Sequence, residues 1–225
     1  MEIFIDTANI EDIKKFSKIG IIDGVTTNPA LISKEGKDFK KVVSEICDIV
    51  DGPVSAEVVS KDAENMIKEA QLISKIHKNI IVKLPATIAG FEALNIISQE
   101  GIRTNFTIVY TANQALCAAK LGATYVSPFI GRLDVTSTDG SKLIDEIVKI
   151  YKNYNFKTKV LAASMRNSVY AKKAAISGAH AITVPPNTLH DMLFSELTEM
   201  SLDGFLHEWK KLPEEKRNYF MKNNK

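Results

Sequence analysis

A lysine ends a short apolar segment near the middle of the chain. In residues 79–87, β-favouring residues lead into Lys83, and Pro85, which has no N–H to donate, ends the predicted strand. Burying an ammonium group costs free energy, and the neutral amine that burial favours is the nucleophile of Schiff-base chemistry. Alternatively, Lys83 reaches water from an edge strand and hinders aggregation. This segment alone leaves both interpretations open.

Two acidic residues stand at comparable places. Asp6 follows the strand-like residues 2–5, and Glu57 lies within the apolar segment 54–59. A carboxylate in an apolar strand is rare unless it is paired, which favours a functional role for Glu57, whereas Asp6 taken alone is better explained as a turn residue or a helix cap. If both face one cavity with Lys83, they can support carbonyl chemistry. The amine attacks a ketone, one acid and a bound water move protons as the imine forms, and the other carboxylate accepts the hydroxyl proton whose loss breaks a C–C bond.

Further candidates recur near strand ends. Ser164 and Arg166 stand beside a predicted helix N-terminus, where the helix dipole and a guanidinium suit a phosphate, and Arg132 could supply a second cation. Each candidate has an ordinary alternative as a cap, a turn residue, a strand former, a core side chain or a surface arginine. The other candidates are Asn28, Asn105, Thr107, Ser127 and Phe129.

Short apolar segments alternate with helical patterns along the chain, and these elements must position the candidates. The predicted strands are residues 2–5, 24–29, 54–59, 80–84, 104–109, 125–130, 159–163 and 181–184. The first predicted helix ends near residue 19. The other predicted helices span about 39–50, 61–76, 90–99, 111–121, 141–151, 167–176 and 188–194. Eight such units indicate the α/β class and a (β/α)8 TIM barrel, with an open parallel sheet as the alternative. In a barrel the carboxyl ends of the strands, and therefore the candidates, meet on one face.

The chain length of 225 residues fits a single domain over 1–225, with residues 196–225 as a C-terminal helical extension. Residues 196–219 of this tail are amphipathic, with apolar residues among charges. Because one barrel already has its eight helices, the apolar side chains of the tail are expected to cover either a barrel end or a neighbouring subunit. The sequence leaves the two equally open.

The composition argues against several classes of partner. Lys and Arg total 29 against 27 acidic residues, so the net charge of +2 predicts neither a nucleic-acid surface nor an anionic membrane as partner. The start of the chain lacks a signal-peptide pattern, and Cys47 and Cys117 are isolated, which together predict a cytoplasmic location. The four histidines show no ligand spacing, so no metal site is expected.

Six motifs resemble those of one enzyme family. They run in order from residue 4 to 167: Phe4-Ile5-Asp6-Thr7-Ala8, Gly24-Val25-Thr26-Thr27-Asn28-Pro29, Ile81-Val82-Lys83-Leu84-Pro85, Thr104-Asn105-Phe106-Thr107, Tyr125-Val126-Ser127-Pro128-Phe129-Ile130-Gly131-Arg132 and Ala162-Ala163-Ser164-Met165-Arg166-Asn167. The set resembles the small-subunit branch of the transaldolase family, which includes fructose-6-phosphate aldolases. One departure is Ala89, where that branch often has an acidic residue.

The resemblance implies a role for each candidate. Lys83 would form the Schiff base, Glu57 would act as acid and base through a water oriented by Thr107, and Asp6 would accept the proton of the substrate hydroxyl. Asn28, Asn105 and Ser127 would bind sugar hydroxyls, and Arg132, Ser164 and Arg166 the phosphate. The implied reaction moves a dihydroxyacetone unit from fructose 6-phosphate or sedoheptulose 7-phosphate to an aldose phosphate in the non-oxidative pentose phosphate pathway. No cofactor is implied, and the branch resembles homo-oligomers, pentamers or decamers.

Three rivals to a transaldolase can be distinguished. Related aldolases tend to carry Gln and Tyr where this chain has Glu57 and Phe129, so both positions favour transfer over release of dihydroxyacetone. A dry pocket would let the enamine wait for a second aldehyde. A silent sugar-phosphate-binding barrel would not need the intact Asp6, Glu57 and Lys83 set. A pyridoxal phosphate enzyme would be yellow.

Overall fold

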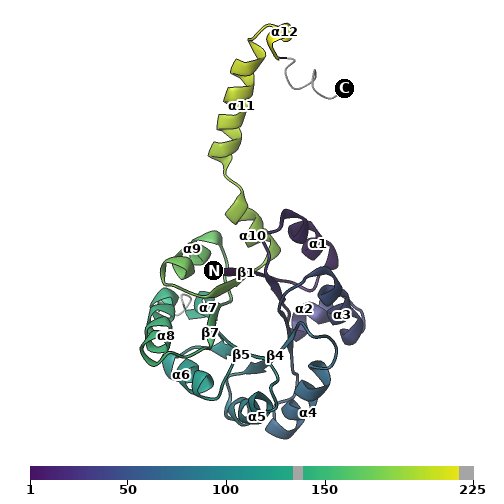
Figure 1. The fold of residues 1–225 in the computed structure, drawn as a ribbon, viewed down its shortest axis with the longest axis vertical. Helices are drawn as coiled ribbons and strands as arrows, with labels where there is room; N and C mark the ends of the chain where they lie inside the picture. Colours follow the sequence, from purple (N-terminus) through teal and green to yellow (C-terminus); the bar gives the residue numbers. More distant parts are fainter. Residues whose placement is uncertain (134–138, 218–225) are drawn as a thin grey trace. The chain divides into compact units, whose positions relative to one another are not determined.

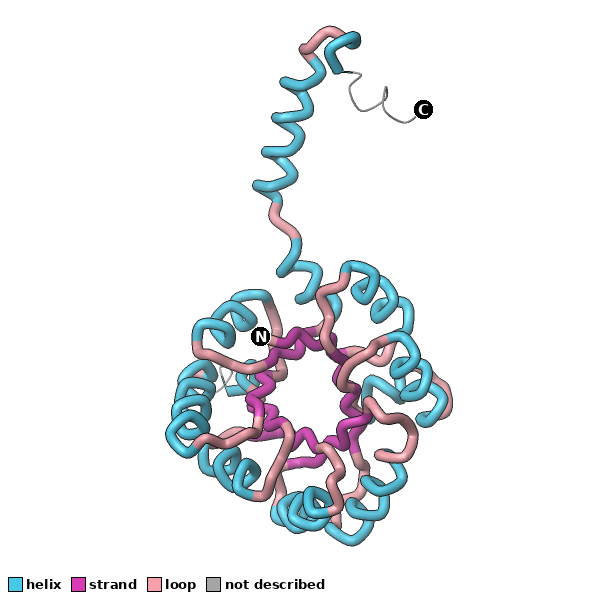
Figure 2. The backbone as a smooth tube through the Cα atoms, in the orientation of Figure 1, coloured by secondary structure: helices cyan, strands magenta, loops and turns pink. Residues whose placement is uncertain are grey.

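Eight parallel strands form a closed barrel at the centre of the fold. The structure is a computed structural model, and it describes residues 1–133 and 139–217. Each strand pairs with its neighbour in chain order, and β1 also pairs with β8, which closes the ring seen in Figure 2. The strands are β1 (Glu2–Asp6), β2 (Gly24–Thr26), β3 (Val54–Glu57), β4 (Ile80–Pro85), β5 (Thr104–Val109), β6 (Tyr125–Pro128), β7 (Lys159–Ala162) and β8 (Ala181–Val184). The predicted (β/α)8 barrel is confirmed, and the open sheet is wrong.

Helices follow every strand, and Figure 1 shows α1, α3, α4, α5, α6, α8 and α9 outside the ring of strands. The helices are α1 (Ile10–Ile19), α2 (Pro29–Lys34), α3 (Phe39–Ile49), α4 (Ala63–Ile73), α5 (Ile88–Gln99), α6 (Ala112–Lys120), α7 (Ile130–Leu133), α8 (Gly140–Tyr154), α9 (Ser168–Ile176), α10 (Pro186–Leu193), α11 (Glu196–Lys210) and α12 (Glu214–Arg217). Many begin at a polar cap: Asn9 accepts from the backbone of α1, and Thr111 forms a capping box with Gln114. Each cap is worth about 1 kcal/mol and fixes where the chain turns from loop to helix.

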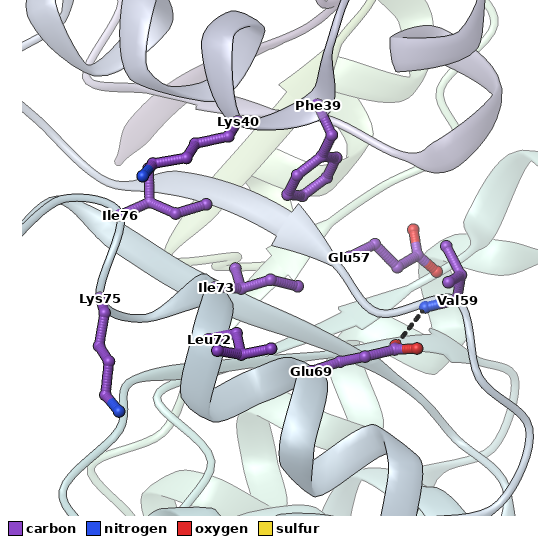
Figure 3. Close-up of a pocket in the computed structure, with 9 residues that line it drawn as sticks. All are labelled: Phe39, Lys40, Glu57, Val59, Glu69, Leu72, Ile73, Lys75 and Ile76. Carbon is purple, nitrogen blue, oxygen red and sulfur yellow. Dashed lines mark hydrogen bonds between the residues drawn. The ribbon is translucent and has the colours of Figure 1, made fainter.

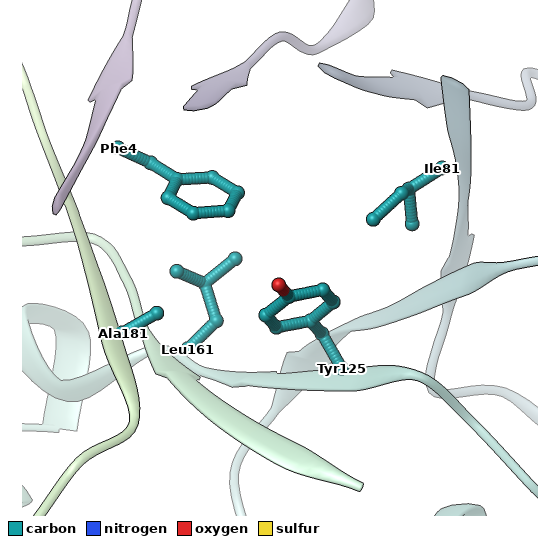
Figure 4. Packing of buried hydrophobic residues seen from close by; sticks show 5 residues of the cluster. All are labelled: Phe4, Ile81, Tyr125, Leu161 and Ala181. Atoms are coloured by element: carbon teal, nitrogen blue, oxygen red, sulfur yellow. The ribbon is translucent and has the colours of Figure 1, made fainter. Parts of the chain in front are cut away.

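An apolar layer fills the barrel below the carboxyl ends of the strands. Figure 4 shows its members pointing into the interior: Phe4, Ile81, Tyr125, Leu161 and Ala181. Side chains alternate along a strand, so the residue two positions further on faces the same interior. Those residues are Asp6, Lys83, Ser127, Ala163 and Thr183. The layer therefore closes one end of the barrel interior and leaves polar groups at the other.

The structure contains elements that the sequence patterns did not predict. Strand β2 ends at Thr26, and Asn28 and Pro29 begin the short helix α2 instead of ending a longer strand. Strand β6 ends at Pro128 because α7 begins at Ile130. Residues 218–225 of the predicted C-terminal extension, which include the last two residues of its amphipathic part, lie outside the described residues.

The chain divides into two compact units, Met1–Leu189 and His190–Lys225. The first holds the barrel, and the second, over its described residues, holds α11 and α12, separated by a break at Leu212 and Pro213. The assignment of one domain over 1–225 with a helical extension stays a prediction, as does the surface that the tail covers. None of the helices in the described ranges has the length and apolarity to cross a membrane.

Candidate active site

A cavity of 200 Å³ opens among the carboxyl ends of the strands. Nine of the eleven predicted site residues line it, namely Asp6, Asn28, Lys83, Asn105, Thr107, Ser127, Phe129, Arg132 and Ser164. Thr26, Ala163 and Thr183 complete the lining, while Glu57 and Arg166 lie outside it. Residues far apart in sequence therefore converge at the face where barrel enzymes carry their chemistry.

Lys83 lies at the floor of this cavity with 6% of its surface exposed. Its Nζ donates to the Thr27 carbonyl at 3.0 Å and forms an ion pair with Glu57 Oε2 at 3.0 Å. Register explains the pairing, because Glu57 on β3 stands opposite Lys83 on β4. Glu57 is therefore the carboxylate within reach to accept a proton from the Lys83 amine.

Glu57 lies beside a second hollow. Figure 3 shows its side chain beside a groove of 630 Å³ between α3 and α4, together with Phe39, Leu72 and Ile73. The groove is lined mainly by hydrocarbon and lacks the convergent polar groups that a reaction needs. Its carboxylate Glu69 accepts from the backbone N–H of Val59 at 2.8 Å and so fixes the loop that follows Glu57.

Asp6 faces the cavity from β1. Its Oδ1 accepts a hydrogen bond of 2.8 Å from Thr26 Oγ1. Burial raises the pKa of the Asp6 carboxyl above the ordinary aspartate value, against the smaller opposing effects of the Lys83 charge and the Thr26 hydrogen bond. A carboxylate with a raised pKa is a stronger base, which suits removal of a hydroxyl proton.

A polar network holds the side of the cavity formed by β5 and β6. Ser127 Oγ donates to Asn105 Oδ1 at 2.7 Å, and Asn105 Nδ2 donates to Ser55 Oγ at 3.2 Å. All three residues are buried, so each bond fixes a polar group that would otherwise be costly to desolvate. Asn28 is the N-cap of α2, with Leu31 N donating to its Oδ1 at 3.0 Å, and it also lines the cavity. The cap role and the predicted site role therefore coexist at Asn28.

Thr107 Oγ1 is buried in the cavity wall and has no hydrogen-bond partner among residues 1–133 and 139–217. A buried hydroxyl without a partner costs free energy, so this atom suits a water or a ligand oxygen. The following residue, Ile108, has a φ of 61°, and the pairing of β5 with β6 shifts between Phe106 and Val109. The register shift is a bulge directly beside Thr107. A β-branched residue at positive φ is a strained outlier, so the backbone of this bulge is strained at Ile108.

Two arginines lie near the cavity entrance, but only Arg132 lines it. Helix α7, which carries Arg132, approaches the loop after β7 closely: a Cβ on Gly131 would lie 2.0 Å from the Ser164 carbonyl oxygen and 3.5 Å from Arg166 Cγ. Ser164 itself has a φ of 61°. Glycine at 131 therefore permits the close approach of α7 to Ser164 and Arg166, although Arg166 is exposed and outside the lining.

Comparison with known proteins identifies the family. The family model described as Transaldolase/Fructose-6-phosphate aldolase matches residues 3–225. This chain belongs to that family. It is 52% identical over 94% of its length to a probable transaldolase of Thermoanaerobacter sp. (strain X514), covering 98% of that relative. It is 54% identical over 95% of its length to a probable transaldolase of Caldicellulosiruptor saccharolyticus, covering 99% of that one.

Similarity to a solved structure extends only to the fold. Thiamine phosphate pyrophosphorylase from Pyrococcus furiosus superposes with a TM-score of 0.58 at 14% identity, covering 82% of this chain and 85% of that one. At this identity the match indicates a shared barrel and carries no information on the reaction.

This member of the transaldolase/fructose-6-phosphate aldolase family has cavity residues that sequence reasoning missed. Thr26 and Thr183 line the site, and Thr27 contributes only its backbone carbonyl to Lys83. Threonine is an ordinary strand residue, so its type gives no sign of a site. The only signal was the alternation along β8, which places Thr183 two positions after the core residue Ala181 and therefore on the same interior face. No group of three or more His, Cys, Asp or Glu side chains in the described part of the chain could hold a metal ion.

Proposed function

We propose that this chain is a transaldolase that transfers a dihydroxyacetone unit between sugar phosphates through a Schiff base on Lys83. The donor would be fructose 6-phosphate or sedoheptulose 7-phosphate, and the acceptor glyceraldehyde 3-phosphate or erythrose 4-phosphate, as in the non-oxidative pentose phosphate pathway. The observation that carries the proposal is the buried Lys83 amine, held 3.0 Å from Glu57 in a cavity that also contains Asp6.

The first half of the reaction forms the imine. Lys83 gives a proton to Glu57 and attacks the ketone carbon of the donor, and a second amine proton passes through a bound water to the carbonyl oxygen, forming a carbinolamine. Glu57 returns the proton to the departing hydroxyl, which leaves as water, and Thr107 Oγ1 is the buried hydroxyl available to orient that water.

The second half breaks and remakes a C–C bond. Asp6 takes the proton of the hydroxyl next to the scissile bond, the bond electrons move into the iminium, and an aldose phosphate leaves. The enamine that remains on Lys83 then adds to the aldehyde of the acceptor, and Asp6 returns its proton to the new hydroxyl. Hydrolysis of the new imine releases the product. Arg132, at the cavity, and Arg166, beside it, supply the cations that a phosphate needs.

The test is intact-mass spectrometry after borohydride reduction in the presence of fructose 6-phosphate, with peptide mapping. We expect an adduct of dihydroxyacetone or hexose phosphate mass on Lys83, and none in Lys83→Met. Lys159→Met is a matched control, since Lys159 is another strand lysine with an acidic partner, Glu2. A folded wild-type protein that binds the ligand without forming an adduct would instead be a sugar-phosphate-binding barrel.

Omitting the acceptor aldehyde distinguishes transfer from aldolase activity. A transaldolase should stall as the enamine, whereas a fructose-6-phosphate aldolase would release free dihydroxyacetone at a steady rate. Phe129 lines the cavity with a ring that offers no hydroxyl to deliver a proton to the enamine, which supports transfer.

We further propose that the chain forms a homo-oligomer, a pentamer or decamer, as the family resemblance implies. Sedimentation or mass photometry would test the number of subunits. A monomer at working concentration would contradict this part of the proposal.

A further inference from the structure

Three oxygen atoms form a chain along one wall of the cavity. Thr183 Oγ1 lies 2.6 Å from Thr26 Oγ1, and Thr26 Oγ1 lies 2.8 Å from Asp6 Oδ1. The three residues come from β8, β2 and β1, and β1 pairs with both other strands. All three line the same cavity.

The number of available hydrogens fixes the direction of this chain. An ionised carboxylate only accepts, so the single hydroxyl hydrogen of Thr26 is donated to Asp6. The bond between the two threonines then requires the other hydroxyl hydrogen, and Thr183 is its donor. Both threonines are buried, so losing either bond leaves a polar group without water to replace its partner, which costs free energy.

We propose that Thr183 is a positioning residue for the proton transfer at Asp6, acting through Thr26. By occupying a lone pair of the Thr26 oxygen, the Thr183 hydroxyl holds the Thr26 hydrogen toward Asp6 Oδ1. Consecutive hydrogen bonds also polarise one another, which strengthens the bond that the carboxylate receives. Oδ1 is then engaged, and Oδ2 is left to take the substrate proton.

This role has a consequence for the pH dependence of the reaction. The Thr26 hydrogen bond and the charge of Lys83 both oppose the effect of burial, which raises the pKa of Asp6. Arg132 is the other charged residue in the described lining of the cavity, and Glu57, outside that lining, is paired with Lys83. Glu2 and His180 lie near the amino ends of β1 and β8, away from the cavity, and are unchanged in the variants below. Weakening the hydroxyl chain should therefore raise the pKa of Asp6 further.

The inference rests on the proposed transaldol reaction and is tested with paired variants. Thr183→Val keeps the shape but loses the hydroxyl, and Thr183→Ser keeps the hydroxyl. We expect the acidic limb of kcat/KM for fructose 6-phosphate to move upward by about half a pH unit in Thr183→Val and to stay in place in Thr183→Ser. If Thr183→Val does not fold, Thr183→Ala against Thr183→Ser gives the same comparison of the hydroxyl at constant loss of the methyl group.

A buried threonine elsewhere provides the matched control. Thr158 has the same exposed fraction as Thr183, 4%, and its Oγ1 donates to the Ala123 carbonyl at 2.7 Å, outside the cavity lining. Thr158→Val should cost stability without moving the acidic limb. An unmoved limb in Thr183→Val, an equal loss of rate at every pH, or the same shift in Thr158→Val would overturn the proposal.

A second readout separates this inference from the proposed function. The carboxyl ¹³C signal of Asp6 in aspartate-labelled protein, assigned by its loss in Asp6→Asn, can be titrated without any substrate. An upward pKa shift in Thr183→Val supports the hydroxyl chain even if the wild-type protein forms no adduct on Lys83. An unchanged pKa of Asp6 in Thr183→Val contradicts the proposed role of the hydroxyl chain even if the wild-type protein transfers quickly.

Discussion

Lys83 and Glu57 face each other across two neighbouring strands, with Nζ and Oε2 3.0 Å apart. Both side chains are largely buried, so the pair is shielded from the screening that weakens surface ion pairs. The Thr27 carbonyl holds Nζ from a third strand-end position. The proposed nucleophile therefore already contacts its proposed proton acceptor and a backbone carbonyl that anchors it.

Replacement of Glu57 by Gln keeps the side-chain shape and removes the proton acceptor. We expect transfer to slow by roughly 10²- to 10⁴-fold, the usual contribution of a general acid–base, while the slow reaction that remains resembles aldol cleavage more than transfer. The measurement is the rate of transfer alongside the rate of dihydroxyacetone release. Unchanged transfer kinetics would count against the assigned role of Glu57. The control is Glu69→Gln, which alters the carboxylate that holds the loop after Glu57 and shows how much a change in that loop alone slows transfer.

Thr107 offers a case in which stability and activity should respond in opposite directions. Its buried Oγ1 has no partner among the described residues, so Thr107→Val should leave the free energy of unfolding unchanged or raise it by about 1 kcal/mol. Imine formation should slow, because the water or substrate oxygen at this position loses its partner. Thermal unfolding measures the change in stability, and the single-turnover rate at which the borohydride-trapped adduct forms measures the change in imine formation. Thr107→Ser is the control that retains the hydroxyl. A large loss of stability in Thr107→Val would show that the hydroxyl has a structural partner.

Asp6 should likewise weaken the fold at neutral pH. Its pKa is raised in the folded protein, chiefly by burial, so the folded state binds this proton more tightly than the unfolded chain does. The wild-type protein therefore loses stability as pH rises from the ordinary aspartate pKa through the raised folded value. Asp6→Asn should be more stable than wild type above that range, nearly equal to it below, and inactive in transfer. Urea unfolding across the pH range would reveal this. A less stable Asp6→Asn protein at neutral pH would mean that attraction to Lys83 exceeds the cost of burial.

Side-chain type and periodicity were enough to predict the barrel and most of the cavity. Lysine and acidic residues in apolar strands are unusual, so Lys83 and Glu57 carried a signal in the sequence alone. Thr26 and Thr183 did not, since threonine is common in any strand, and their bond depends on two strands that meet only when the barrel closes. The Thr27 carbonyl is a backbone atom and leaves no mark in the sequence.

Local turns explain the remaining differences. Asn28 followed by Pro29 is an N-cap followed by proline in the first turn of α2. A helix cap was one of the alternatives for Asn28, but Pro29 was interpreted as the end of a strand, so α2 was not predicted. Arg166 follows the last strand residues of β7 closely in sequence, but the positive φ of Ser164 turns the chain before Arg166 is reached. Spacing along the chain does not reveal such a turn at a non-glycine residue.

The two arginines are expected to contribute unequally to phosphate binding. Arg132 lines the cavity and Arg166 does not, so Arg132→Gln should raise the KM for fructose 6-phosphate by roughly 10- to 100-fold, the usual range for a lost charge-assisted hydrogen bond, and Arg166→Gln by less. Neither change should alter the KM for an unphosphorylated ketose donor. Equal effects on phosphorylated and unphosphorylated donors would indicate a general disturbance of the cavity, and a larger effect at Arg166 would reverse the assignment.

Ile108 should be strained at the bulge beside Thr107. With a φ of 61° it occupies a conformation that costs a β-branched residue about 1–3 kcal/mol, and 37% of its surface is exposed. Comparing Ile108→Gly with Ile108→Ala isolates the backbone, because both lose most of the side chain. We expect the glycine variant to be more stable than the alanine variant by about 1 kcal/mol, as measured by urea unfolding. The same pair at Ile96, 42% exposed within α5, should give the opposite order, since glycine is about 1 kcal/mol worse than alanine in a helix. Alanine being preferred at both positions would show that the bulge stores no strain at Ile108.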